Sequence, residues 1–85
     1  MENGFIDIEL GSPLEIDGAK IKALRMREPT VADQLAASEM SGSAAKQEIT
    51  LMANLCEVTP DDIKRLKLRD YRKLQEAFAV FTEAE

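Results

Sequence analysis

An Asp17-Gly18 pair between two stretches of alternating apolar and polar residues places the strongest constraint on the fold of this chain. A two-residue hairpin turn of type I′ needs positive φ at both central positions, and Asp-Gly is one of the few pairs that adopts it readily. Alternation with a period of two is typical of a strand with one buried face. The sequence therefore predicts an antiparallel hairpin over residues 5–26.

Both strands of this hairpin carry an irregularity. Gly11-Ser12-Pro13 interrupts the alternation of the first strand, and Pro13 cannot donate to a ladder, so the strand lies at an edge or bulges there. In the second strand the apolar phase changes between Ala23 and Leu24, which predicts a bulge there as well.

The remainder of the chain, residues 30–84, reads as helical. Thr30 and Thr59 are each followed three residues later by an aspartate, as in a capped helix N-terminus. The expected helices span residues 31–40, 44–57, 60–66 and 68–82. Because an isolated hairpin is marginally stable in water, we expect it to pack on these helices. The predicted fold is one α+β domain over residues 1–85, with an N-terminal hairpin packed on three to four short helices.

The composition favours a small soluble domain. The chain has 85 residues, a net charge of −5 and 45% hydrophobic residues, which is too apolar for a disordered segment. Its N-terminus lacks the pattern of a signal peptide, and its longest apolar run, residues 77–81, is too short to span a membrane. Cys56 has no cysteine partner. These features predict a protein of the reducing cytoplasm that does not enter membranes.

No catalytic, cofactor-binding or metal-binding residues are expected. The chain contains no histidine, no pair of cysteines and no glycine-rich phosphate loop. Cys56 lies in an apolar helical segment beside Glu57, which disfavours the thiolate and predicts a buried structural thiol. Asp61 and Asp62 fall in the first turn of a helix, where they complement its dipole. We therefore expect a protein that is not an enzyme.

The helix expected over residues 44–57 carries two apolar faces. In so small a domain, covering both faces internally is difficult. The helix is therefore either central and buried on both sides, or it offers one face to another chain. Ile49, Met52, Ala53 and Cys56 form one face, and Leu51, Leu55 and Val58 form the other. We take the second face as the candidate partner-binding surface, with Leu51 and Leu55 expected to be exposed.

The last helix combines an apolar stripe with a basic segment. Tyr71, Leu74, Phe78 and Phe81 share one side and are expected to face the core. Residues 64–73 contain six basic residues and one acidic residue, which indicates a solvated face or a contact with an acidic partner. Arg69 and Arg72 are the candidate contacts in that case. A nucleic-acid partner is not expected, because this segment has a single aromatic residue and the chain is acidic.

Several segments together resemble the tail assembly chaperones of Mu-like tailed bacteriophages and related prophages. Residues 26–33, Met-Arg-Glu-Pro-Thr-Val-Ala-Asp, resemble that family's Leu-Arg-Glu-Pro-Thr segment with its following Asp. Residues 51–63 are similar to its leucine-rich helix and proline-started turn, and residues 68–77 to its closing Leu-Arg-Asp-Tyr helix. Residues 13–18 resemble its hairpin.

The resemblance implies a role without catalysis, in the cytoplasm of a bacterial host. Such proteins are thought to bind the long, partly hydrophobic tape measure protein and keep it soluble while the tail tube polymerises. In many of these phages a longer form contacts tail tube subunits. On this interpretation, the face around Leu51 and Leu55 covers an apolar helix of the client. Arg27 and Glu28 either contact a partner or form an ion pair in a loop, and we expect the ion pair.

Other classes stay open on the residues alone. An acyl carrier protein is also small, acidic and helical, but the chain lacks the Asp-Ser-Leu attachment site that such a protein needs. A small regulator, such as an antitoxin or anti-activator, would use the same apolar face against one globular partner. A homo-oligomeric structural subunit would bury that face in a ring.

Overall fold

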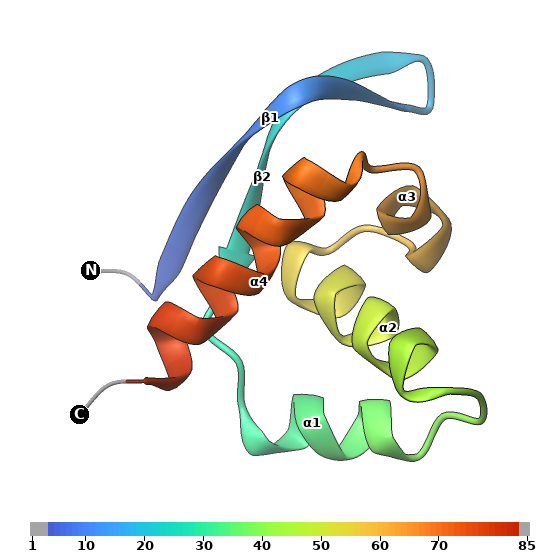
Figure 1. Cartoon of the computed structure of the whole chain (residues 1–85), viewed down its shortest axis with the longest axis vertical. Helices are drawn as coiled ribbons and strands as arrows, with labels where there is room; N and C mark the ends of the chain where they lie inside the picture. Colours follow the sequence, from blue (N-terminus) through green and yellow to red (C-terminus); the bar gives the residue numbers. More distant parts are fainter. Residues whose placement is uncertain (1–3, 84–85) are drawn as a thin grey trace.

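In a computed structural model, residues 4–83 form a hairpin followed by four helices (Figure 1). The strands are β1 (Phe5–Ile16) and β2 (Ala19–Arg27). The helices are α1 (Val31–Ser38), α2 (Ala44–Cys56), α3 (Pro60–Lys64) and α4 (Leu68–Thr82). This architecture confirms the α+β class predicted from the sequence. All four helices begin where the capping and periodicity signals place them, and residue 84 of the expected helical part lies outside the described residues.

The hairpin explains the phase change of its second strand. Asp17 and Gly18 adopt φ values of 53° and 83°, as the predicted type I′ turn requires. Ile8 pairs with Leu24, and Leu14 pairs with Ile21, so β1 advances six residues while β2 advances three. The extra residues lie in β1, at the predicted Gly11-Ser12-Pro13 bulge, and the bulge expected in β2 is wrong. Because the shift is odd, apolar residues of opposite parity in β2 reach the same face.

The bulge is held by a buried aspartate of α4. The side chain of Asp70 is fully buried, and its two carboxylate oxygens accept hydrogen bonds from the backbone N–H groups of Gly11 at 2.8 Å and Ser12 at 3.1 Å. Lys73 lies 3.5 Å from the same carboxylate. These N–H groups hold the pKa of Asp70 below its usual range, because they stabilise the ionised form. The contact joins α4 to β1.

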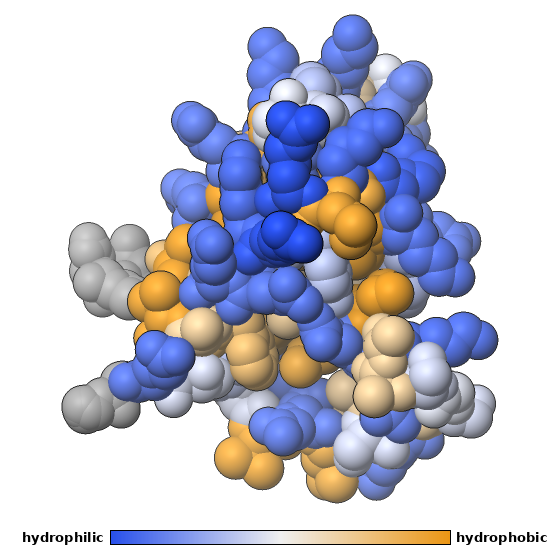
Figure 2. Space-filling model, in the orientation of Figure 1, coloured by the Kyte–Doolittle hydropathy of each residue, from blue (hydrophilic) through white to orange (hydrophobic). Residues whose placement is uncertain are grey.

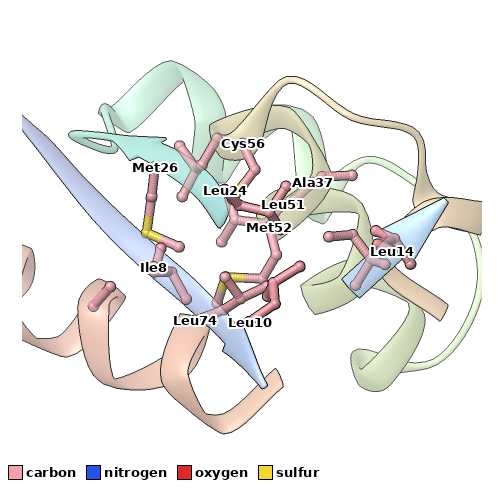
Figure 3. Close-up of a cluster of buried hydrophobic side chains, with 14 residues drawn as sticks. Ile8, Leu10, Leu14, Leu24, Met26, Ala37, Leu51, Met52, Cys56 and Leu74 are labelled. Carbon is pink, nitrogen blue, oxygen red and sulfur yellow. The ribbon is translucent and has the colours of Figure 1, made fainter. Parts of the chain in front are cut away.

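The core forms between the inner face of the hairpin and the helices, with α2 at its centre. Side chains from both strands, α2 and α4 meet in one cluster (Figure 3). Five residues of α2 are buried, and they lie on both of its apolar faces: Leu51, Met52, Ala53, Leu55 and Cys56. The wide apolar arc of α2 therefore reflects a central helix, covered from several sides by β2, α1 and α3.

This packing overturns the expected exposure of the second α2 face. Leu55 has no exposed surface and Leu51 is 9% exposed, so the prediction that both face solvent is wrong. Val58, just beyond the helix, is half-buried and packs against the core. The physical reason is that the hairpin and the other helices together cover more of α2 than the size of the domain suggested.

The apolar stripe of α4 faces the core as predicted. Leu74 is fully buried, while Tyr71, Phe78 and Phe81 are partly buried against the same cluster. The aromatic rings therefore border the core, and the smaller Leu74 and Ala77 fill its interior.

We expect the substitution Asp70→Asn to lower the free energy of unfolding by about 1–3 kcal/mol, because an amide nitrogen would face a backbone donor in a buried site. Urea denaturation measures the change. Asp61→Asn is the matched control, since Asp61 also lies in the first turn of a helix but is exposed. We expect the control to leave the urea midpoint almost unchanged, as is usual for exposed positions. Equal effects of the two substitutions would contradict a structural role for Asp70.

Candidate partner-binding surface

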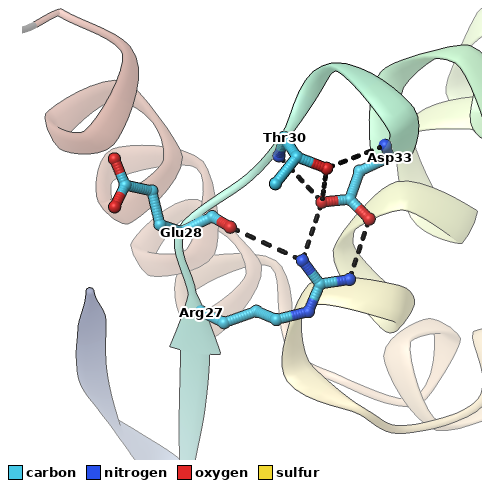
Figure 4. A network of polar contacts seen from close by, with 4 residues as sticks. All are labelled: Arg27, Glu28, Thr30 and Asp33. Atoms are coloured by element: carbon cyan, nitrogen blue, oxygen red, sulfur yellow. Dashed lines mark hydrogen bonds and ion pairs between the residues drawn. The ribbon is translucent and has the colours of Figure 1, made fainter. Parts of the chain in front are cut away.

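The start of α1 is fixed to the end of β2 by an ion pair. Two nitrogens of the Arg27 guanidinium donate to the two oxygens of Asp33 at 2.7 and 2.8 Å (Figure 4). Arg27 also donates to the backbone oxygen of Glu28 at 3.5 Å. The expected ion pair between Arg27 and Glu28 is therefore wrong, because the carboxylate partner of Arg27 is Asp33. The motif that carried the resemblance sets the angle at which α1 leaves the hairpin.

Asp33 also caps α1. One of its oxygens accepts from the backbone N–H of Thr30 at 2.8 Å, and the Thr30 hydroxyl accepts from the N–H of Asp33 at 3.3 Å. This reciprocal arrangement is a capping box. The Arg27 hydrogen bonds, together with those from Thr30, hold the pKa of Asp33 far below its usual range. The carboxylate thus fixes both the first turn of α1 and its attachment.

Helix α1 lies at the edge of the core and leaves most of its surface exposed to solvent. Ala37 is its one buried residue, while Val31 is 85% and Leu35 is 56% exposed. At about 100° per residue, Val31 and Leu35 point away from Ala37. Figure 2 shows apolar side chains gathered at the lower edge of the molecule, over α1. A short helix that keeps its large apolar residues in water is a candidate contact surface.

A groove of about 580 Å³ lies where α1, residues 44–52 of α2 and the second half of α4 meet. Its volume falls within the range of ligand-binding clefts. The apolar part of its lining is formed by Ala37, Ala44, Leu51, Met52 and Phe78, and the polar part by Gln34, Ser38, Gln47, Glu48, Gln75 and Thr82. The groove therefore combines an apolar surface with polar groups that are mostly uncharged.

The single charged group in this lining is held in place. One carboxylate oxygen of Glu48 accepts from the hydroxyl of Tyr71 at 2.8 Å and from the side-chain amide of Gln75 at 2.8 Å. Burial of the ring, followed by the neighbouring carboxylate, raises the pKa of Tyr71 above its usual value. Tyr71 therefore stays protonated and donating, and the wall between α2 and α4 keeps a defined shape.

The five residues predicted to contact a partner do not form one surface. Leu51 lines the groove, although little of its side chain is exposed. Leu55 lies behind it in the core, and Val58 is half-buried and does not line the groove. Arg69 and Arg72 are exposed on α4, away from the groove lining.

Some basic residues of the segment 64–73 bind β1, and others have no charged partner within residues 4–83. Arg65 donates to the backbone oxygen of Glu15 at 2.7 Å, and Lys73 donates to that of Glu9 at 2.8 Å, so both hold β1. Arg69 and Arg72 make no ion pair within residues 4–83. The sequence reasoning missed the role of Asp70, although a lone acid within a basic segment was an available signal. No sequence signal marked the groove glutamines.

The described residues offer little for catalysis. Cys56 is buried, and desolvation raises the pKa of its thiol to about 11, which disfavours the reactive thiolate. No group of three or more His, Cys, Asp or Glu side chains placed to hold a metal ion occurs in residues 4–83. Within the same residues, no helix has both the length and the apolar character needed to cross a membrane.

The sequence of this chain matches one known protein family over most of its length. Residues 7–83 match the family described as "phage tail assembly chaperone proteins, E, or 41 or 14". The chain belongs to this family. The match confirms the resemblance found in the sequence and covers both strands and all four helices apart from the first residues of β1. No curated protein and no solved structure matches the chain.

For this tail assembly chaperone, we expect Arg27→Gln to loosen α1 more than the rest of the fold, because Asp33 would lose its charged partner. Hydrogen exchange measured by mass spectrometry should show faster exchange in α1 than in α4. Arg25→Gln is the matched control on the same strand, since the Arg25–Asp7 pair is exposed and such pairs contribute little to stability. If both substitutions leave α1 equally protected, the ion pair does not hold it.

We also expect the chaperone to lose stability in acid. The pKa values of Asp33 and Asp70 lie below the ordinary aspartate value of about 4 in the folded chain. Their contribution is therefore complete above that value and is lost as the pH falls toward the folded-state values, because the unfolded chain binds protons first. The urea midpoint should decrease as the pH is lowered from neutral to about pH 3. An Asp33→Asn/Asp70→Asn variant should show a smaller fall.

Proposed function

We propose that this chain binds apolar helical segments of a phage tape measure protein and keeps them soluble during tail assembly, in the cytoplasm of the host and without catalysis. Family membership supports the assembly role. The observation that carries the finer proposal is the groove between α1, α2 and α4, with its apolar lining and largely uncharged polar groups.

The groove suits a helix that presents apolar side chains at helical spacing. In this mode of recognition an amphipathic helix lays its apolar face into a hydrophobic groove. Leu51 and Phe78 would contact the inserted side chains, while the glutamines Gln34, Gln47 and Gln75 offer hydrogen bonds to the flanking polar groups. The exposed face of α1, with Val31 and Leu35, would extend the apolar contact beyond the groove.

A modest affinity at each site is sufficient for such a role. A long client with repeated apolar segments engages many chaperone molecules, and linked binding events raise the overall avidity without tighter single contacts. The net charge of −5 would help to keep the coated client in solution. The largely uncharged groove walls would also tolerate different client segments, because apolar burial does not depend on one particular side chain.

We expect Ser38→Trp to abolish client protection, because the indole would occupy the groove. Ser38 is exposed at the end of α1 and lines the groove, so the substitution leaves the core intact. The tape measure protein is co-expressed with each variant, and its soluble fraction and co-purification are measured. The soluble fraction should fall to the level seen without chaperone.

Ala23→Trp provides the matched control. Ala23 is exposed on β2 and does not line the groove, so this variant adds the same ring elsewhere. It should protect the client as the unmodified chain does, and circular dichroism should show the same helix content in both variants. Full protection by the folded Ser38→Trp variant would refute the groove as the client site.

A further inference from the structure

Four exposed residues form a continuous ridge along α4. Leu68, Arg72, Glu76 and Val80 follow one another at intervals of four residues, which places them in one row on the surface of a helix. Leu68 is 73% and Val80 is 61% exposed, and the two charged residues are also exposed. We refer to these four residues as the α4 ridge. It is a large exposed feature that neither the core nor the client groove uses.

The ridge lies on the outward side of α4, where Glu76 and Val80 also border a shallow hollow beside β1. At about 100° per residue, its centre points opposite to Leu74, the fully buried residue of this helix. Figure 1 shows α4 in front of the other elements, and Figure 2 shows strongly hydrophilic side chains over its N-terminal half. Arg72 and Glu76 form no ion pair with each other or with other groups of residues 4–83.

The order of residues makes the ridge complementary to itself. It reads apolar, positive, negative, apolar from one end to the other. When a second copy runs in the opposite direction, Leu68 meets Val80 of the second copy, and Arg72 meets Glu76 of the second copy. A twofold axis produces each of these contacts twice, which is the property of an isologous interface.

We propose that the α4 ridge is a dimer interface, occupied by a second copy of this chain. Ridges formed by residues four apart pack side by side when two helices cross at about −50°, the commonest arrangement in globular proteins. Arg69 lies beside Leu68 at the N-terminal end of the ridge, and Glu83 directly follows α4 at its C-terminal end, so in an antiparallel pair basic residues of one copy approach acidic residues of the other. The contact is small and the dimer is weak and concentration-dependent.

The dimer does not depend on the client groove. The α4 residues that line the groove are Gln75, Phe78 and Thr82, on another side of the helix. Both grooves therefore stay open when two copies join through their ridges. If the groove binds a client, a dimer presents two sites to one long chain and raises its avidity.

Sedimentation equilibrium of the full chain, over a concentration series reaching millimolar, tests the proposal. The unmodified chain should form dimers that dissociate as salt is added, because the paired charges are exposed. Arg72→Glu and Glu76→Arg should each weaken the dimer by at least about tenfold, since each replaces two attractions with two repulsions. The charge-swapped variant Arg72→Glu/Glu76→Arg should dimerise again.

An equimolar mixture of the two single variants gives the sharpest readout. In the mixed dimer one copy carries two acidic residues at the centre of the ridge and the other copy carries two basic ones. Both charge pairs are then attractive, so the mixture should dimerise more strongly than either variant alone.

Lys22→Glu on the hairpin is the control, because it makes the same change of net charge as Arg72→Glu at an exposed position outside the ridge. It should dimerise as the unmodified chain does, and circular dichroism should confirm that every variant keeps its helices.

Three results would overturn the proposal. The unmodified chain could remain monomeric over the whole series, or it could form larger assemblies in place of dimers. The Arg72→Glu variant could also dimerise as strongly as the unmodified chain. These measurements use no client, so their failure is distinct from a failure of the proposed client binding.

Discussion

The carboxylate of Asp70 joins the two halves of this fold. Its two oxygens accept hydrogen bonds from the backbone N–H groups of Gly11 and Ser12. These two residues lie in the β1 bulge and do not pair with β2. Without such a partner, these two part-buried donors would have no hydrogen bond within the protein, which would destabilise the bulge. With the bulge fixed, the odd shift in register brings apolar residues from both parts of β2 onto the face that covers the helices.

The central position of α2 follows from that arrangement. The hairpin covers one side of the helix while α1 and α3 cover others, so its wide apolar arc is used almost entirely in the core. Apolar surface for a partner is left instead at α1 and in the groove beside it. The Arg27–Asp33 pair is what allows α1 to remain displayed, because it attaches the helix through charge where apolar burial contributes little.

The two aspartates lie in two of the segments that carry the family resemblance. Asp33 ends the first segment and positions the helix beside the groove, while Asp70 lies in the last segment and fixes the hairpin. Neither motif supplies a reactive group. Their ionised carboxylates shape a surface, which agrees with membership of a family of assembly chaperones.

The sequence by itself determined most of the local structure, apart from the bulge wrongly expected in β2. The Asp17-Gly18 turn, the caps at Thr30 and Thr59 and the helix starts all depend on interactions within about four residues, and each was predicted correctly. Only the tertiary structure decided that both apolar faces of α2 are covered, what Asp70 binds, and where a groove forms. Asp70 and Gly11 are 59 residues apart, and the groove draws on three helices. Such contacts depend on how whole elements pack, and no pattern within one element specifies its neighbours.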